Sequence, residues 1–218
     1  SLSYANISPE GKLEIFGPSS SFSVENIPTD WVLEGINYKQ FSSQHLSIDN
    51  ADGLSTIRLI SSGNNFVFLR RTKASLLASP FLGWSWNVSP PLGQIAAIRL
   101  IIGFNGGNPE GRGWGSSPLV NLGTNIPLYD RVITVVWGKN SDSRGTIEKK
   151  SKLPRYIIRA GTKDTGNWLN ENIDLSNLYR VLWPDDNAVQ ANIIFVGLAS
   201  GSAAVPTIAK FRNLMLYR

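Results

Sequence analysis

Apolar and polar residues alternate with a period of two along most of this chain. Residues 82–88 show the pattern best: every second residue is apolar, Trp84 and Trp86 among them, and the residues between are Gly, Ser and Asn. Successive side chains of an extended chain point to opposite faces, so this segment predicts a strand that carries two indoles on one face. Those indoles either fill a core or form a platform for a flat ligand.

Other short segments are rich in β-branched and aromatic residues and end at turn residues, which predicts further strands. We expect them at residues 13–16, 31–38, 45–48, 55–60, 66–71, 95–104, 130–138, 154–160, 167–172, 191–198 and 208–217. The turns after 45–48 and 55–60 predict that these two strands and 66–71 form an antiparallel meander. Residues 95–104 are apolar on both faces, which is typical of a central strand, and Arg99 is the exception. Such an arginine must find a carboxylate, a carbonyl or a ligand.

One helix is predicted. It begins after Asp174, a good N-cap residue, and ends at Pro184. About a dozen short strands and one helix predict an all-β fold, a two-sheet antiparallel jelly-roll sandwich with one short helix. No repeat or change of composition marks a boundary, so we expect residues 1–218 to form a single domain, with residues 1–30 as an N-terminal arm or edge strand.

The composition excludes several kinds of site. The chain has no cysteine and one histidine, His45, so we expect no disulfide, no thiol nucleophile, no metal site and no cofactor. The net charge of +5, from 21 Lys and Arg and 16 Asp and Glu, is spread along the sequence. Nucleic-acid binders concentrate their cations, so no nucleic-acid partner is expected. No stretch approaches the ~18 apolar residues of a membrane-spanning helix, so no membrane span is expected either.

No catalytic motif stands out in the sequence. The Gly-x-Ser-x-Gly elbow of serine hydrolases and the glycine-rich phosphate loop are both absent. A glycoside hydrolase would need two carboxylates about 5 to 9 Å apart. The candidates are Asp130, Glu171 and Asp174. A polysaccharide lyase would use a tyrosine base beside arginines, for which Tyr156 with Arg155 and Arg159 is the candidate cluster.

Arginines and tryptophans in or near the strands suggest a binding surface. Indole faces stack on sugar rings, and arginine forks pair with carboxylates or sulfates. The candidate ligand-binding residues are Trp84, Trp86, Arg99, Trp114, Arg131, Trp137, Arg155, Arg159 and Trp168. The leading prediction is a non-enzymatic carbohydrate-binding module, for an acidic glycan if the arginines share one face. The alternatives are a lyase or glycoside hydrolase on the same scaffold and a structural envelope protein. For the candidate residues themselves, the alternative is that the tryptophans fill the core and the arginines face water, paired with Asp and Glu.

Four short motifs carry a family resemblance. They are residues 83–88, residues 131–137, the stretch from Arg159-Ala160-Gly161 to Trp168, and residues 209–214. With them, the chain from about Trp31 onward resembles a bacterial family of unknown function, domain of unknown function 3047. The resemblance implies an exported jelly-roll protein, periplasmic or secreted, and implies no activity. The family's acidic stretch before the last strand is replaced here by small residues at 199–204, so a metal role does not carry over.

Overall fold

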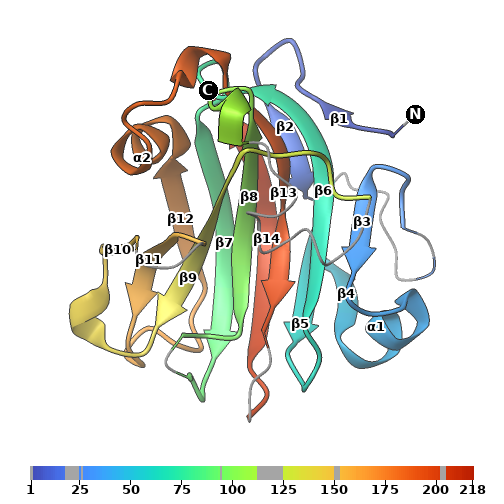
Figure 1. Ribbon diagram of the computed structural model, residues 1–218. Coiled ribbons are helices and arrows are strands. Elements are labelled where there is room, and N and C mark those ends of the chain that lie inside the picture. Colours follow the sequence, from blue (N-terminus) through green and yellow to red (C-terminus); the bar gives the residue numbers. More distant parts are fainter. Residues whose placement is uncertain are drawn as a thin grey trace.

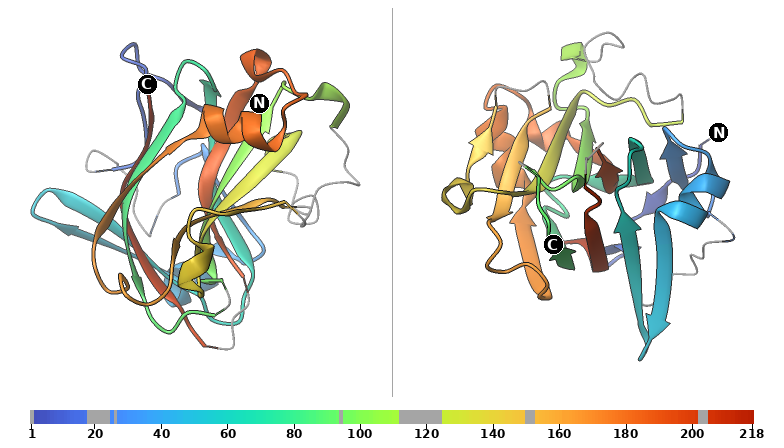
Figure 2. Two further views of the ribbon diagram at one scale, coloured as in Figure 1. Left: turned by 90° about the vertical axis from the view of Figure 1, so that its left-hand side faces the viewer. Right: turned by 90° about the horizontal axis from the view of Figure 1, so that it is seen from below.

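The protein is a sandwich of two β-sheets (Figure 1). The structure, a computed structural model, describes residues 2–17, 25, 27–93, 95–111, 125–149, 153–201 and 205–218. Figure 2 shows the two sheets as separate layers when the molecule is viewed from the side. The predicted all-β jelly-roll sandwich is confirmed, and most strand pairs are antiparallel; β1 with β6 and β9 with β11 are parallel.

The larger sheet has eight strands. In spatial order they are β1 (Ala5–Asn6), β6 (Phe66–Ser75), β13 (Asn192–Ser200), β8 (Ile98–Asn105), β9 (Arg131–Gly138), β11 (Arg155–Ala160) and β10 (Ile147–Glu148), with β3 (Trp31–Glu34) also paired to β6. The smaller sheet has six strands. Their order is β12 (Leu169–Asp174), β7 (Phe81–Ser89), β14 (Ile208–Tyr217), β5 (Leu54–Ile60) and β4 (Leu46–Ala51), with β2 (Leu13–Phe16) also paired to β14.

Tryptophans join the two sheets in the core. The Trp86 ring on β7 lies 5.4 Å from the Trp137 ring on β9 and 6.1 Å from the Phe211 ring on β14, measured between centroids. Trp84 packs edge-on against Trp86 at 5.7 Å. Alternation explains this arrangement, because Leu82, Trp84, Trp86 and Val88 of β7 all point toward the opposite sheet.

A second apolar cluster lies on the outer face of the eight-stranded sheet. Leu100 and Ile102 belong to the main core, so Ile101 between them points away from it. We call this group the outer apolar cluster; its buried members are Val32, Val67, Leu69, Ile101, Ile126, Val132, Phe195 and Ala199. Residues between β8 and β9, Ile126 and Tyr129, pack on it, so this central strand has apolar contacts on both faces, as its sequence predicts.

Two α-helices are present in the described residues, where one was predicted. The predicted helix is α2 (Leu175–Leu182), and the Asp174 side chain caps it by accepting the N–H of Asn177 at 3.0 Å. The additional helix is α1 (Tyr38–Gln44), which begins at the last residue of the expected 31–38 strand. Gly35 ends that strand early: its φ of +94° suits glycine, and a Cβ there would lie 2.5 Å from the Asn65 carbonyl oxygen. Short 3₁₀ turns occur at Pro109–Gly111, Ser141–Ser143 and Ala188–Gln190.

The predicted meander is wrong. Strands β4 and β5 do form an antiparallel hairpin, but β5 pairs next with β14 in the smaller sheet, whereas β6 belongs to the larger one. The turn after β5 therefore carries the chain from one layer to the other. In both views of Figure 2 the β4–β5 hairpin projects beyond the neighbouring strands.

Candidate functional site

Three of the predicted tryptophans lie in the core. Trp84 is 3% exposed, and Trp86 and Trp137 are fully buried. Trp137 Nε1 donates a hydrogen bond to the Gly161 carbonyl at 2.8 Å. No ligand could stack on these indoles without opening the sandwich, so they have the core role that the sequence left as the alternative. Trp114 lies outside the described residues.

Three of the predicted arginines have acidic partners. Arg131 forms two hydrogen bonds to Asp186, at 2.8 and 3.0 Å, and lies over the Trp183 ring. Its hydrogen bonds to Asp186 raise the pKa of Arg131 above the usual value for a guanidinium. Arg155 pairs with Glu148 at 2.8 Å. These arginines do not gather around one site with the tryptophans.

Arg159 and Glu171 are also paired, which bears on the catalytic alternatives. Glu171 lies 2.7 Å from the Arg159 guanidinium, and Asp174 caps α2. Asp130 Oδ2 accepts the backbone N–H of Gly106 at 2.7 Å. Each candidate carboxylate thus has a structural partner, and no observation places two of them around a shared cleft.

The lyase cluster is divided by the strand it lies on. Tyr156 packs against the main core, whereas Arg155, its neighbour on β11, points to the outer face. A bulge between Ile157 and Arg159 then changes the alternation before Arg159. Within the described part of the chain, no three Asp, Glu, His or Cys side chains gather closely enough to hold a metal ion. The described helices also include none long and apolar enough to cross a membrane.

The outer face of the six-stranded sheet combines an aromatic ring with polar and cationic side chains. Cross-strand register aligns Asn170, Ser85 and Arg212 in one row, and Asn87, Lys210 and Arg58 in another. Trp168, just before β12, lies under the Arg212 guanidinium, whose carbon is 4.1 Å from the ring centroid. We call this surface the polar face; its members are Arg58, Ser85, Asn87, Trp168, Asn170, Lys210 and Arg212.

The cations of the polar face have no acidic partner. Arg58, Lys210 and Arg212 form no ion pair with any Asp or Glu side chain in the described ranges. Lys210 on β14 lies directly opposite Arg58 on β5. Arg212 Nε donates to the Thr56 hydroxyl at 2.8 Å, which holds this side chain across the sheet. The face is therefore positively charged and partly fixed in position.

Hydrogen bonds also orient the neutral side chains of the polar face. The Ser85 hydroxyl donates to the Asn170 amide oxygen, and Asn87 Nδ2 donates to the Gly166 carbonyl at 3.1 Å. Each amide keeps further donor or acceptor positions that these contacts do not use. Hydroxyl-rich ligands need such paired donors and acceptors.

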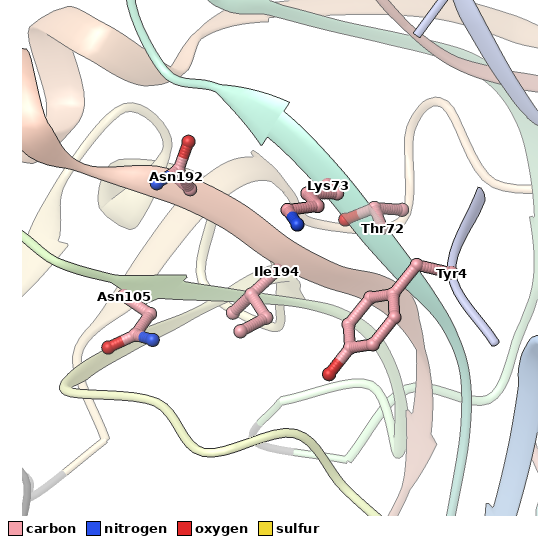
Figure 3. Close-up of a pocket in the computed structure, with 6 residues that line it drawn as sticks. All are labelled: Tyr4, Thr72, Lys73, Asn105, Asn192 and Ile194. Carbon is pink, nitrogen blue, oxygen red and sulfur yellow. The ribbon is translucent and has the colours of Figure 1, made fainter. Parts of the chain in front are cut away.

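A small pocket lies elsewhere, between the N-terminal segment and strands β6, β8 and β13 (Figure 3). Its volume is about 230 Å³. Its lining residues are Tyr4, Thr72, Lys73, Asn105, Asn192 and Ile194. Figure 3 shows the Tyr4 ring, the Lys73 amine and the two asparagine amides arranged around the opening. The Asn105 Oδ1 atom is buried and has no hydrogen-bond partner among the described residues. At ~30 Å³ per water, the volume equals about seven or eight waters, so the pocket suits one small polar group rather than a chain.

The sequence pointed to Trp168 but missed its cationic neighbours. Lys210 and Arg212 alternate with apolar residues along β14, and this pattern alone places both on one face. Their position beside Trp168 depends on cross-strand register, which the local sequence does not reveal.

No model of a known protein family matches the chain, and no curated protein matches it. The resemblance to domain of unknown function 3047 therefore stays a prediction. Among solved structures, the chain is similar to a family 30 carbohydrate-binding module of a Clostridium thermocellum cellulosomal cellulase, with 15% identity over 94% of this chain and 96% of that one and a TM-score of 0.42.

Two further solved structures show a similar degree of likeness. Endoglucanase 3 of Trichoderma harzianum, from family GH12, has 10% identity over 89% of this chain and 91% of that one, with a TM-score of 0.43. The family 11 carbohydrate-binding module of a Clostridium thermocellum cellulosomal cellulase has 8% identity over 96% of both chains, with a TM-score of 0.41. Likeness at this level says nothing of a ligand.

Proposed function

We propose that the protein is a non-enzymatic carbohydrate-binding module that holds an acidic glycan chain on the polar face. The observation that carries the proposal is the exposed Trp168 ring beside Arg212, on a surface whose other cations have no acidic partner. Trp168 is 37% exposed and is the one aromatic residue among the large apolar side chains that the described structure leaves exposed. An exposed indole beside amides offers both stacking and hydrogen bonds to a sugar.

The opposed cations support an acidic ligand. Like charges directly opposite each other on neighbouring strands destabilise a sheet, and Arg58 and Lys210 are placed in this way. A carboxylate or sulfate between them would remove the repulsion and form charge-assisted hydrogen bonds. The same cations would attract an anionic polymer over distances of about 10 Å at roughly 0.1 M salt, and over longer distances at lower salt.

The dimensions of the polar face suit a chain of sugars rather than one ring. The face extends from β12 across β7 and β14 to β5. At about 4.8 Å between strands, these four strands span ~14 Å. Trp168 lies at one end of this span and Arg58 at the other, so an extended oligosaccharide could contact both.

Export belongs to the same proposal. Acidic polysaccharides occur in cell walls and in the extracellular medium, so a module that binds them acts in the periplasm or after secretion. The family resemblance implies the same location.

Affinity electrophoresis and calorimetry with charge-matched polymers test the proposal. Polygalacturonate is compared with its methyl-esterified form, and dextran sulfate with dextran, so that each pair differs in charge and not in backbone. We expect retention by the acidic member of at least one pair. Trp168→Ala and Lys210→Gln should each weaken binding by about fivefold to tenfold, the effect of losing roughly 1 kcal/mol of contact.

Arg144→Gln is the matched control. Arg144 is exposed, and its replacement by glutamine removes one positive charge at a site away from the polar face. If no acidic polymer retains the protein, or if Arg144→Gln weakens binding as much as Lys210→Gln, the proposal is overturned. The second result would mean that net charge alone attracts the polymer.

A further inference from the structure

The Arg99 guanidinium lies on the outer face of the eight-stranded sheet, and its Nε donates no hydrogen bond to any described residue. It lies on β8, opposite Ala199 of β13, and two residues before Ile101, so it shares a face with the outer apolar cluster. Its Nε is buried and has no hydrogen-bond partner among the described residues. The sequence predicts that this arginine must find a carboxylate, a carbonyl or a ligand.

No carboxylate of the chain neutralises Arg99. It takes part in none of the ion pairs within 4.0 Å that the described residues form. The segments outside the described residues contain no Asp or Glu, so every acidic side chain belongs to the described part of the chain. Arg99 is thus a cation for which the protein itself supplies no counter-ion.

A second arginine lies on the same face. Ile101 and Arg155 are both register partners of Thr134 on β9, so Arg99 and Arg155 point outward from strands on either side of β9. The Nε of Arg155 is also buried without a partner in the described structure, although its Nη2 pairs with Glu148. Burial lowers the pKa of Arg99, and the positive charge of Arg155 lowers it further.

The surroundings of Arg99 leave space for its guanidinium. A Cβ atom on residue 201 would lie 3.2 Å from Arg99 Nη1, so glycine at this position avoids a tight contact. A buried charge without compensation is costly, and a second like charge nearby adds to the cost. A bound anion would lower both costs at once.

We propose that Arg99 and Arg155 form an anion-binding site between β8 and β11, for a carboxylate or a small oxyanion such as sulfate or phosphate. Two guanidinium groups offer several N–H donors in planar forks, which match the oxygens of such anions. This site is on the opposite sheet from the polar face, and it does not depend on the proposed glycan function.

Thermal unfolding and calorimetry of the full chain test this site. Sodium sulfate, phosphate and glucuronate are each added at constant ionic strength, with sodium chloride as the balance. Because sulfate stabilises most proteins by exclusion from their surfaces, the comparison is between wild type and Arg99→Met. We expect one of the anions to raise the Tm of wild type more than that of Arg99→Met, and its affinity to fall about tenfold or more in the variant.

The variant also has an expected effect without any ligand. Methionine keeps most of the side-chain volume and removes the uncompensated charge, so in anion-poor buffer the Tm of Arg99→Met should equal or exceed that of wild type. Arg155→Gln should weaken the anion response, and Arg144→Gln should leave it unchanged. A response to glucuronate alone would identify a uronate carboxylate as the ligand, and a response to sulfate or phosphate would identify a free oxyanion; both support the site.

Equal anion responses in wild type and Arg99→Met would overturn the proposal, and so would a Tm of Arg99→Met well below that of wild type in anion-poor buffer. Trp168→Ala should keep the anion response, and Arg99→Met should keep glycan binding on the polar face. Failure of either proposal can therefore be recognised independently of the other.

Discussion

Arg159 and Glu171 form a bidentate ion pair that connects the two sheets at one edge of the sandwich. Arg159 Nε lies 3.0 and 3.1 Å from the two carboxylate oxygens, and Nη2 lies 2.7 Å from Oε1. Arg159 belongs to β11 of the larger sheet and Glu171 to β12, the end strand of the smaller one. The Glu171 side chain is 3% exposed, so Arg159, and not water, provides most of its hydrogen bonds.

Removing the arginine should therefore destabilise the protein. We expect Arg159→Met to lower the free energy of unfolding by about 3 kcal/mol, because it leaves the buried Glu171 carboxylate without its partner. Urea denaturation measures the change. The double variant Arg159→Met/Glu171→Met should recover most of the loss, since neither charge remains. Losses that simply add in the double variant would show that the pair is not coupled.

Asp174 should make the stability of α2 depend on pH. Burial raises the pKa of Asp174, but hydrogen bonds from the Ser176 hydroxyl and from backbone N–H groups of Asn177 and Ser176 outweigh it, so the net pKa lies below the usual value. A depressed pKa in the folded state means that the charged form stabilises the fold. This contribution is complete above the unfolded pKa of about 3.9 and is lost as the pH falls through the folded pKa.

We expect Asp174→Ala to cost about 1 kcal/mol at neutral pH and progressively less in acid, where the wild-type carboxylate is protonated. Thermal unfolding at a series of pH values measures this difference. Asp174→Asn is the control, because asparagine caps a helix without a titrating group. A difference between wild type and Asp174→Ala that stayed constant down to strongly acidic pH would contradict the assignment.

Gly197 permits the close approach of β13 to β6. A Cβ atom at this position would lie 2.3 Å from Leu69 Cα and 2.4 Å from the Phe68 carbonyl oxygen, both of which are backbone atoms. We expect Gly197→Ala to lower the free energy of unfolding by about 2 to 3 kcal/mol, since the strands must separate. Gly93→Ala is the matched control, because the nearest atom to its Cβ would be the Ile95 oxygen at 3.4 Å. Equal stability of the two variants would show that the close contact has no energetic role.

The opposed cations of the polar face should reduce stability in the absence of ligand. Arg58→Gln removes the repulsion with Lys210, so we expect the ligand-free variant to be more stable than wild type by about 0.2 to 1 kcal/mol. The same change should weaken retention by acidic polymers. The stability gain should shrink at high salt, where exposed charges are screened. A variant that lost both stability and binding would indicate a structural role for Arg58.

Local sequence pattern was enough to find most strands and the cap of α2. Period-two alternation located β7 and β14, and Asp174 followed by an apolar stripe located the helix, because these signals act within a few residues. The sequence did not predict α1, although Asn37 accepts the N–H of Gln40 as its N-cap, because the β-branched and aromatic residues of 31–38 favour a strand as far as Tyr38.

Features that depend on pairing between distant strands could not be found in this way. A turn such as residues 61–65 fits either a hairpin or a crossing between sheets, and the local chemistry does not distinguish them. The core position of Trp86 and the exposed position of Trp168 depend on which sheet face each strand presents. Likewise, the ion pairs of Arg131 and Arg159 join elements that are apart in sequence, so the sequence could name these arginines but not their partners.

The pairing of β2 with β14 has a consequence for how the protein folds. Leu13 lies beside Leu216, so two strands that are far apart in the sequence must meet before the smaller sheet is complete. Contacts between such distant segments carry a large loop-closure entropy, and proteins dominated by them fold in roughly milliseconds to seconds. The rate at which β2 finds β14 should therefore limit how quickly the sandwich closes.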